Sequence, residues 1–455
     1  MSLDVIILAA GQGSRMKSKK PKVLHGIGGK PMVQHVIDCA QELDTPRIHV
    51  VVGHGAEQVR DALAGQALEF ALQAEQLGTG HAVAQALAGT TPDGISLVLY
   101  GDVPLTRSET LRQLVEIAGQ DKLGLLTVKL SDPTGYGRII RDDAGQVVAI
   151  VEHKDASAAQ REVNEVNTGI LALPTRLLAD WLPRLSSNNA QGEYYLTDVI
   201  AMAADQAVRI EAIQPEHEQE VQGVNNRLQQ AELERWYQLR EAQRLMHNGV
   251  TLLDPSRLDV RGSLSAGFDV VIDINCVFEG RVVLGNDVSI GPNCHIKDAV
   301  IGDGCQIRAN SVIDQAQLQE NCDIGPFARL RPGTELAAGV KVGNFVETKK
   351  ARIGEGSKVN HLSYVGDALL GSDVNVGAGT ITCNYDGVNK SQTEIGDGAF
   401  IGSNSALVAP VKVGAGATVG AGSTITRDVA EAQLSVARGK QRNLDNWPRP
   451  LKRES

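Results

Sequence analysis

From residue 395 to residue 425 an aliphatic side chain recurs at every sixth position, with small or polar residues in between. Glycine follows four of these positions, at 396, 402, 414 and 420. A period of six fits neither an α-helix nor a plain strand. It is typical of hexapeptide repeats, in which the chain winds as a triangular prism with about three hexapeptides, roughly eighteen residues, in each coil. The six positions are Ile395, Ile401, Leu407, Val413, Val419 and Ile425.

The same spacing continues upstream through most of the second half of the chain. The register slips by one residue between most runs, and one longer break separates Thr382 from Ile395. Accidental spacing would not keep the sixth position aliphatic almost throughout, so we expect a parallel β-helix. The spacing leaves its handedness open, although the usual crossover rule favours a right-handed winding. The inward positions expected upstream are Ile272, Phe278, Leu284, Ile290, Ile296, Ile301, Ile307, Ile313, Leu318, Ile324, Leu330, Leu336, Val342, Ile353, Val359, Val365, Leu370 and Val376.

The first half of the chain alternates short aliphatic runs with helical patterns. We expect strands at 5–10, 47–52 and 95–100, and helices at 31–43, 57–63 and 80–87. This order predicts a Rossmann-like α/β domain whose sheet is mostly parallel and covered by helices on both faces. Ligands of such sheets bind beyond the carboxyl ends of the strands. Two features fall there, the loop after the first strand and Asp102.

The loop after the first strand is rich in glycine, with Gly11 and Gly13 followed by Arg15. A dinucleotide fingerprint would need a third glycine where Met16 stands. Exposed backbone N–H groups followed by the cations Arg15 and Lys22 suit a nucleoside triphosphate instead. The alternative for residues 17–22 is a solvated basic turn.

Asp102 follows an apolar strand and precedes Val103-Pro104. A carboxylate at this place suits Mg²⁺, which takes one or two protein oxygens together with phosphates and waters. A turn-forming aspartate is an equally good interpretation of the position alone.

Residues 227–247 contain no proline or glycine and predict one long helix that ends near Asn248-Gly249. Leu239, Ala242 and Met246 would share its apolar face. We interpret the helix as a rigid spacer, which divides the chain into a nucleotide-binding domain at 1–227, a helical linker at 228–248 and a repeat domain at 249–455.

Composition excludes several classes of protein. The 455 residues carry a net charge of −10 with acidic and basic residues mixed, which argues against a nucleic-acid surface. No apolar run approaches the length that spans a membrane, and the N-terminus has no basic segment typical of a signal peptide. The six cysteines have no metal-ligand spacing, so we expect reduced thiols in a cytoplasmic protein.

The repeat region departs from its pattern in two places. His361 puts an imidazole where a small or acidic residue is usual, and residues 383–390 form an insertion that breaks the six-residue count. Loops that leave a regular solenoid usually carry binding. A lone histidine is more often structural, so His361 by itself is a weak candidate.

A specific resemblance begins at Leu8-Ala9-Ala10-Gly11-x-Gly13-x-Arg15-Met16, followed by Pro21-Lys22, which is similar to the signature of sugar-1-phosphate nucleotidyltransferases. Residues 73–80, 100–102, 135–138, 152–154, 167–169 and 223–226 match further motifs in family order. With the hexapeptide array behind them, the whole chain resembles the family of bacterial bifunctional N-acetylglucosamine-1-phosphate uridylyltransferases and glucosamine-1-phosphate N-acetyltransferases.

This resemblance implies two reactions in one chain. Glucosamine-1-phosphate would be acetylated by acetyl-CoA, and the product would then accept UMP from UTP with release of pyrophosphate. The UDP-N-acetylglucosamine formed is a precursor of peptidoglycan and lipopolysaccharide. The resemblance also implies a left-handed β-helix and a homotrimer with the acetyl-transfer site between prisms.

For uridylyl transfer the resemblance implies uridine binding by Gly11, Gln73, Gly78 and Thr79, and triphosphate binding by Arg15 and Lys22. Asp102 and Asn225 would hold Mg²⁺. The sugar would lie against Gly137, Glu152 and Asn167. The same substrate-binding set includes Leu8, Ala9, Ala10, Tyr100 and Gly101.

For acetyl transfer the resemblance implies that His361 is the general base, an imidazole whose pKa lies near working pH. Arg331 and Lys349 would bind the sugar phosphate, and Tyr364 and Asn375 the sugar. The basic tail at 438–455 is either a disordered end or an arm over a neighbour's acetyl-CoA site, and Arg438 favours the arm. The acetyl-CoA residues would be Ala378, Asn384, Tyr385, Ser403, Ala421 and Arg438.

Two other functions compete with this one. A nucleotidyltransferase could use the β-helix for assembly alone, but such a prism needs neither His361 nor the insertion. A scaffold with a degenerate nucleotide domain would not need Arg15, Lys22 and Asp102 intact.

Overall fold

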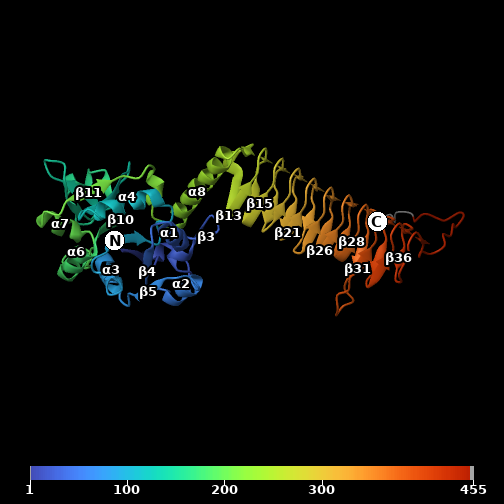
Figure 1. Ribbon diagram of the computed structural model, residues 1–455, viewed down its shortest axis with the longest axis horizontal. Coiled ribbons are helices and arrows are strands. Elements are labelled where there is room, and N and C mark those ends of the chain that lie inside the picture. The colour runs from blue at the N-terminus through green and yellow to red at the C-terminus, as the bar shows by residue number, and fades with distance from the viewer. Residues whose placement is uncertain (1, 451–455) are drawn as a thin grey trace. The chain divides into compact units, whose positions relative to one another are not determined.

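A computed structural model describes residues 2–450, and the chain divides into two compact units between Gln238 and Leu239 (Figure 1). The first unit is an α/β domain and the second is a β-helix, as the sequence predicts. The last five residues of the predicted arm, 451–455, lie outside the described part of the chain. Within residues 2–450 no helix is long and apolar enough to cross a membrane.

The first unit is built on a nine-stranded sheet. Its strands follow the order β11-β7-β10-β6-β1-β4-β5, with β8 and β9 attached beside β10. β1 pairs in parallel with both β4 and β6, and β10 alone in the main path runs antiparallel to its neighbours. The sheet is therefore mostly parallel. Its strands are β1 Leu3–Ala9, β4 Pro46–Val52, β5 Glu69–Leu72, β6 Ile95–Tyr100, β7 Leu123–Lys129, β8 Arg138–Arg141, β9 Val147–Val151, β10 Glu165–Pro174 and β11 Ile210–Ile213, and a separate hairpin joins β2 Gly26–Ile27 to β3 Lys30–Pro31.

Helices cover both faces of this sheet because its central strand is apolar on both sides. Val5 and Ile7 of β1 pack in one core cluster with residues of α1, α2 and α4, whereas Ile6 and Leu8 pack in another with α3, α6 and α7. The predicted elements are found with ends shifted by at most two residues. The helices are α1 Met32–Gln41, α2 Ala56–Ala62, α3 Thr79–Leu87, α4 Ser108–Ala118, α5 Ala158–Arg161, α6 Thr175–Trp181 and α7 Asp198–Asp205, with 3₁₀ turns η1 Ser14–Met16, η2 Lys22–Leu24, η3 Leu182–Arg184 and η4 Glu218–Val221.

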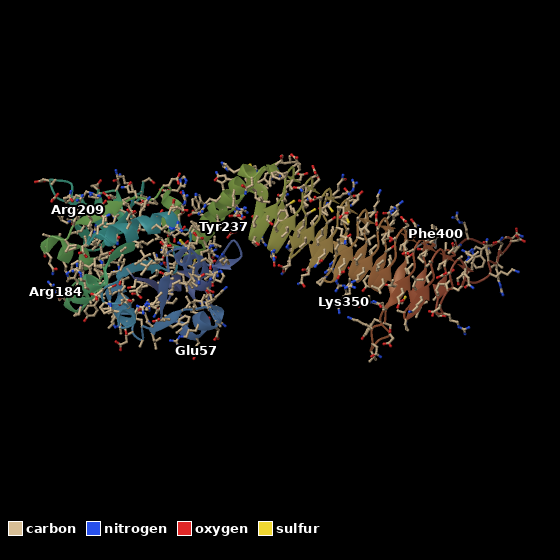
Figure 2. All side chains as sticks on the ribbon, in the orientation of Figure 1. Glu57, Arg184, Arg209, Tyr237, Lys350 and Phe400 are labelled. Carbon is tan, nitrogen blue, oxygen red and sulfur yellow. The ribbon has the colours of Figure 1, made fainter. Side chains whose placement is uncertain are left out.

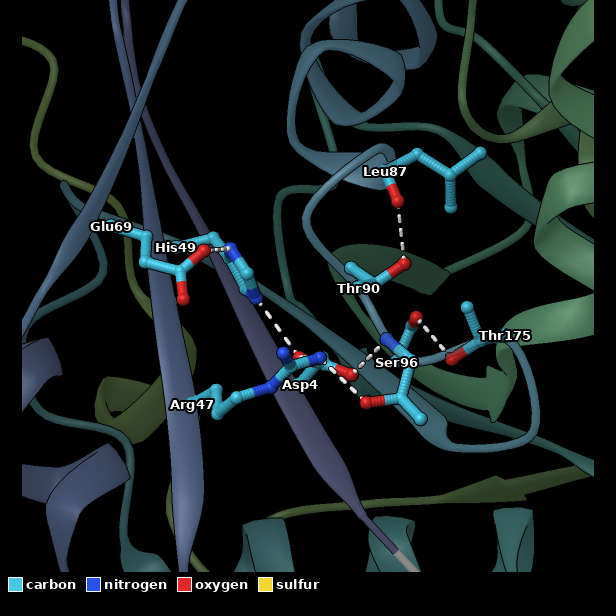
Figure 3. A network of polar contacts seen from close by, with 9 residues as sticks. Asp4, Arg47, His49, Glu69, Leu87, Thr90, Ser96 and Thr175 are labelled. Atoms are coloured by element: carbon cyan, nitrogen blue, oxygen red, sulfur yellow. Dashed lines mark hydrogen bonds and ion pairs between the residues drawn. The ribbon is translucent and has the colours of Figure 1, made fainter.

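A buried polar network ties β1 to β4 near the amino ends of the strands (Figure 3). Asp4 accepts hydrogen bonds from His49 Nε2 at 2.9 Å and from the Thr91 amide at 2.8 Å, and it pairs with Arg47 at 2.7 Å. Burial alone would raise the pKa of Asp4, but these donors and the Arg47 charge outweigh it and lower the pKa. The network fixes the register of β1 at the end opposite to its Gly-rich loop.

Helix α8, Arg227–His247, packs on both units in turn. In the first half of the helix Leu233 is buried. Gln230 donates to Gly26 O and Glu234 accepts from the Gly28 amide, so this half of the helix holds the β2–β3 hairpin. In its second half Ala242 and Leu245 join the core of the β-helix.

The apolar face predicted for this helix is wrong in part. Ala242 is buried, but Leu239 is 43% exposed and Met246 is 38% exposed, and Leu245 is buried in their place. The buried positions in this part of the helix are Gln238, Ala242 and Leu245, at i, i+4 and i+7, so the buried face is turned by about one position from the predicted one.

The second unit stacks parallel strands in successive coils (Figure 1). Along the face formed by the 11-stranded sheet, Lys341 pairs in register with Lys358 and Lys358 with Asn375, so each of these two coils takes 17 residues, whereas 18 separate Phe400 from Thr418. This confirms a parallel β-helix; its left-handed winding stays a prediction from the resemblance. The strands of this face are β12 Thr251–Leu252, β14 Val271–Ile272, β16 Ser289–Ile290, β19 Gln306–Ile307, β22 Asp323–Ile324, β25 Lys341–Asn344, β27 Lys358–His361, β29 Asn375–Val376, β32 Phe400–Ile401, β35 Thr418–Val419 and β37 Leu434–Ser435.

The remaining strands form a 15-stranded sheet that makes up the rest of each coil. Figure 2 shows the side chains on the outside of the prism, among them Lys350 and Phe400. These strands are β13 Leu258–Ala266, β15 Cys276–Leu284, β17 His295–Lys297, β18 Val300–Ile301, β20 Val312–Asp314, β21 Ala316–Leu318, β23 Arg329–Leu330, β24 Thr334–Leu336, β26 Glu347–Ile353, β28 Tyr364–Leu370, β30 Ile381–Cys383, β31 Thr393–Ile395, β33 Ala406–Val408, β34 Val411–Val413 and β36 Thr424–Ile425, and the 3₁₀ turn η5 Pro255–Arg257 precedes β13.

Every inward position predicted from the period of six is buried, with at most 5% of any of these residues exposed. Each such side chain contributes roughly 1.5–3 kcal/mol of burial free energy. The glycines that follow them allow the coils to stack closely. A Cβ at Gly402, for example, would lie 2.5 Å from the Ala421 nitrogen of the next coil.

The predicted insertion leaves the prism as a loop between β30 and β31, drawn in orange beside β31 in Figure 1. It is closed by an antiparallel bridge between Tyr385 and Lys390. All six cysteines are free, as expected.

Candidate functional site

A cavity of about 290 Å³ lies in the first unit where β1 and β6 end. It gathers predicted residues from four separate stretches of sequence, because parallel strands deliver their following loops to one edge of the sheet. It also includes four residues that the sequence did not single out, Val23, Gln76, Ala82 and Glu193. The predicted residues that line it are Leu8, Ala9, Ala10, Gly11, Lys22, Gln73, Gly78, Thr79, Tyr100 and Asp102.

Cationic and oxygen-bearing side chains converge at one side of this cavity. The Lys22 ammonium pairs with the Asp102 carboxylate and donates to Asn225 Oδ1 at 3.2 Å. Arg15 Nη2 donates to the same Asn225 oxygen at 2.9 Å. Lys22 and Asp102 are mostly buried, with 14% and 17% of their side chains exposed. The predicted triphosphate and metal residues therefore form one cluster.

The cluster has the oxygen donors that Mg²⁺ prefers. A carboxylate oxygen of Asp102 and the amide oxygen of Asn225 converge on one positively charged nitrogen, so both can reach one cation. Among the described residues no group of three or more histidine, cysteine, aspartate or glutamate side chains could hold a metal. Two protein oxygens completed by phosphates and water fit this donor set.

The residues predicted for the sugar lie together beside Tyr100. The Asn167 amide donates to Gly137 O at 2.8 Å, and a Cβ at Gly137 would lie 3.3 Å from Glu152 Oε1. Burial raises the pKa of Glu152, and the Thr197 hydroxyl, which donates to it at 3.3 Å, only partly offsets this.

Tyr100 lies between this group and the cluster of Lys22, Asp102 and Asn225. Burial raises the pKa of its phenol, and the nearby charges of Glu152 and Asp102 raise it further. Both carboxylates therefore lie close to the same ring. Gly101 continues the backbone after it and donates its amide to Leu8 O at 2.9 Å.

Two polar residues of the cavity were missed from the sequence. Gln76 belongs to the motif at 73–80 that the sequence analysis identified. Its position three residues after Gln73 could have indicated that it lines the same cavity. Glu193 had none, because it reaches the cavity through the segment in which the Tyr194 amide bonds to Leu77 O at 2.8 Å.

In the second unit several predicted acetyl-transfer residues form one column along a corner of the prism. Backbone bonds join successive coils here: Gly379 N to His361 O, Asn404 N to Ala378 O, and Gly422 N to Ser403 O. Arg438 closes the column by donating to Ala421 O at 2.6 Å. The column therefore runs through His361, Ala378, Ser403 and Ala421 to Arg438.

A second group lies on the 15-stranded sheet. Arg331 and Lys349 are neighbours across two coils, since the Arg331 amide bonds to Thr348 O at 2.9 Å. The nearby ammonium of Lys349 lowers the pKa of Lys390, a residue to which the sequence gave no role. Two ammonium groups therefore lie near each other at the loop, and the guanidinium of Arg331, one coil away, pairs with Glu347 at 2.7 Å.

Tyr364 and Asn384 complete this group. Asn384 Nδ2 donates to the Tyr364 hydroxyl at 3.4 Å and to the Asp367 carboxylate. A Cβ at Gly366 would lie 2.3 Å from the Tyr364 oxygen, so the phenol lies directly over this glycine. Tyr385 follows on the loop and is 58% exposed.

Asn375 is not brought to this group within one chain. It lies on β29 of the 11-stranded sheet, in register with Lys358, whereas Tyr364 lies on β28 of the other sheet. The predicted residues of the acetyl-transfer site therefore occupy two faces of the prism.

Three family models match parts of the chain. A MobA-like NTP transferase domain matches residues 5–165, a GMPPB C-terminal domain matches 260–353, and six bacterial transferase hexapeptide repeats match 392–427. A solved structure of a putative glucose-1-phosphate thymidylyltransferase from Bacillus anthracis is 18% identical with a TM-score of 0.42, covering 51% of this chain and 94% of that one.

Curated relatives match nearly the full length. The bifunctional protein GlmU of Marinobacter nauticus is 63% identical over 450 residues, which is 99% of both chains. The bifunctional protein GlmU of Cellvibrio japonicus is 64% identical over 451 residues, which is 99% of this chain and all of that protein. At this identity and coverage, the chain belongs to the family of bifunctional GlmU proteins.

Proposed function

We propose that the two groups of residues serve two steps of UDP-N-acetylglucosamine synthesis. The chain is a bifunctional enzyme with N-acetyltransferase and uridylyltransferase activities. The second unit acetylates glucosamine-1-phosphate with acetyl-CoA. The first unit then joins N-acetylglucosamine-1-phosphate to UMP from UTP.

The convergence of Lys22, Asp102 and Asn225 at the cavity carries the uridylyl assignment. A phosphate oxygen of the sugar phosphate attacks the α-phosphorus of UTP, and the bond to pyrophosphate breaks. This needs alignment and neutralisation of charge rather than a protein nucleophile. Lys22 and Arg15 supply fixed cations, and Glu152 accepts hydrogen bonds from the sugar.

Asp102 and Asn225 would hold Mg²⁺ when substrate is bound. The ion would neutralise the phosphates during the transfer. Lys22 pairs with Asp102 in this structure, and with the ion held by that carboxylate its ammonium would be free to contact the triphosphate.

His361 is proposed as the general base of acetyl transfer. The amine nitrogen of glucosamine-1-phosphate attacks the thioester carbonyl of acetyl-CoA, and the carbon–sulfur bond breaks to release CoA. His361 takes the proton that the amine loses. Arg331, Lys349 and Lys390 supply positive charge for the sugar phosphate, and the corner column with Arg438 supplies a track for acetyl-CoA.

The working form is proposed to be a homotrimer in the cytoplasm. Because the acetyl-transfer residues occupy two faces of one prism, a second prism is needed to bring Asn375 of one chain near Tyr364 of another. A corner of the prism offers a surface for this contact. Phe327, Phe345 and Leu362 are all large, exposed and held at positive φ in successive coils, with the two phenyl rings stacked 5.3 Å apart.

At the same corner other coils carry Asn310, Gly379, Asn404 and Gly422, the residue types that tolerate positive φ. Bulky residues there are strained, and this indicates a role that outweighs the strain. Contact with another prism would bury them.

One experiment tests the whole proposal. The full chain is incubated with glucosamine-1-phosphate, acetyl-CoA, UTP and Mg²⁺, and both free CoA and UDP-N-acetylglucosamine are measured. Both products are expected. Formation of a nucleotide sugar only when N-acetylglucosamine-1-phosphate is supplied would reduce the chain to a nucleotidyltransferase, and absence of both products would leave a scaffold.

A further inference from the structure

Asn344 lies beside His361 at the start of the corner column. The two residues are register partners of the parallel strands β25 and β27, and the amide after His361 bonds to the Asn344 carbonyl at 3.1 Å. Their side chains meet as well, because His361 Nδ1 lies 3.0 Å from Asn344 Oδ1. Backbone register and side-chain contact therefore hold the same pair.

We infer that Asn344 is a positioning residue that selects the tautomer of His361. An amide oxygen can only accept a hydrogen bond, so its neighbour Nδ1 must carry the proton. The lone pair is then on Nε2, which is the state that a general base needs. The inference rests on the proposed role of His361 in acetyl transfer.

The surroundings of the pair agree with different roles for the two ring nitrogens of His361. The next position of the column is Ala378, whose methyl group makes no hydrogen bond and leaves the imidazole exposed on that side. Asn344 is half-buried while His361 is exposed. One ring nitrogen is thus held by the protein and the other is open to a ligand.

Removal of the Asn344 side-chain amide should lower the turnover of acetyl transfer without weakening the binding of either substrate. In Asn344→Ala we expect kcat of acetyl transfer to fall roughly 10- to 100-fold, the usual loss when the partner that orients a functional imidazole is removed. The KM values for glucosamine-1-phosphate and acetyl-CoA should stay within about two-fold, because Asn344 is expected to contact neither. The variant should fold, since alanine already stands at the equivalent positions 378 and 421 of this column.

Asn344→Asp is the matched variant. A carboxylate accepts the same hydrogen bond and also favours the imidazolium. We expect it to restore most of kcat at alkaline pH and to move the acidic limb of the kcat–pH profile to higher pH. A merely structural role would move no pKa.

His361→Ala distinguishes a failure of the proposed function from a failure of the inference about Asn344. If it leaves acetyl transfer normal, the proposed function fails. If it abolishes transfer while Asn344→Ala keeps full kcat, or raises only KM, the inference about Asn344 is overturned. An unshifted pH profile in Asn344→Asp overturns it too. Far-ultraviolet circular dichroism and melting of each full-length variant establish that the β-helix is intact.

Discussion

The two units assemble their sites in opposite ways. In the α/β unit a concave edge of the sheet gathers Leu8, Gln73, Tyr100 and Asp102 from distant stretches into one cavity. In the β-helix the repeat places His361, Ala378, Ser403 and Ala421 one coil apart on a convex corner, and it leaves Asn375 on a different sheet from Tyr364.

The difference concerns what each fold can enclose. A parallel sheet with helices on both faces encloses a ligand within one chain. A prism of short strands has an aliphatic interior and displays its polar groups outward, so a second surface must supply the other wall. The cavity of the first unit is lined by residues of one chain, and the second site is expected to depend on association.

The largest effect is expected from His361→Ala. Removing the general base should cost roughly 10²- to 10⁴-fold in acetyl transfer. Uridylyl transfer from supplied N-acetylglucosamine-1-phosphate should be unchanged, because its cavity contains no residue of the second unit. Separate assays of CoA release and pyrophosphate release measure the two activities, and a parallel loss of both would contradict two independent sites.

Asp102→Asn is the converse experiment. Loss of the carboxylate shared by Lys22 and the proposed metal should lower uridylyl transfer by about 10²- to 10³-fold. Calorimetric titration of Mg²⁺ in the presence of UTP should show weaker binding. Mixed with His361→Ala, this variant should restore the route from glucosamine-1-phosphate to UDP-N-acetylglucosamine. Normal Mg²⁺ affinity in Asp102→Asn would remove this residue from the metal site.

Phe345→Asn tests whether the second site depends on association. Asparagine tolerates positive φ, so the variant should relieve about 1 kcal/mol of strain within each chain. It should nevertheless weaken assembly in sedimentation and lower acetyl transfer by about ten-fold at dilute protein, while uridylyl transfer stays normal. Phe268→Asn removes a ring outside the corner that is 76% exposed, against 55% for Phe345, and serves as the control. A fully active monomer would show that one prism is enough.

The smallest effect concerns Glu152. Burial raises its pKa, so between the ordinary glutamate pKa and this raised value the folded state binds more protons than the unfolded state. The free energy of unfolding therefore falls as pH rises through that window, and above it the full penalty of the buried charge remains. Glu152→Gln should thus melt a few degrees higher than the parent at pH 8 and lose this advantage at lower pH. Its KM for N-acetylglucosamine-1-phosphate should rise about ten-fold. A lower melting temperature at pH 8 would contradict the cost of the buried charge.

Much of this contrast could be predicted from the sequence. Every position that the period of six predicted to point inward is buried, because one aliphatic side chain per side is a local requirement of the prism. The Gly-rich loop and Asp102 could be placed at one sheet edge, because the order of strands and helices determines where loops converge.

The rest depended on contacts that no local pattern encodes. Glu193 enters the cavity because the amide of the next residue, Tyr194, bonds to Leu77 O, more than a hundred residues away in sequence. Leu239 and Met246 fit an apolar stripe but remain exposed, because α8 buries Gln238 and Leu245 in their place. The pairing of His361 with Asn344 needs the register of two coils, which slips along the repeat.

Helix α8 also limits how this gene could be divided or recombined. It begins one residue after Asn226, and its first half holds the hairpin next to Lys22 while its second half covers the first coils of the prism. A crossover in its first half would separate the first unit from part of the helix that covers it, and a crossover in its second half would do the same to the prism. Evolution could exchange either enzyme only together with its own half of the helix, so a shared structural element, and not only a shared pathway, favours inheritance of the two activities as one chain.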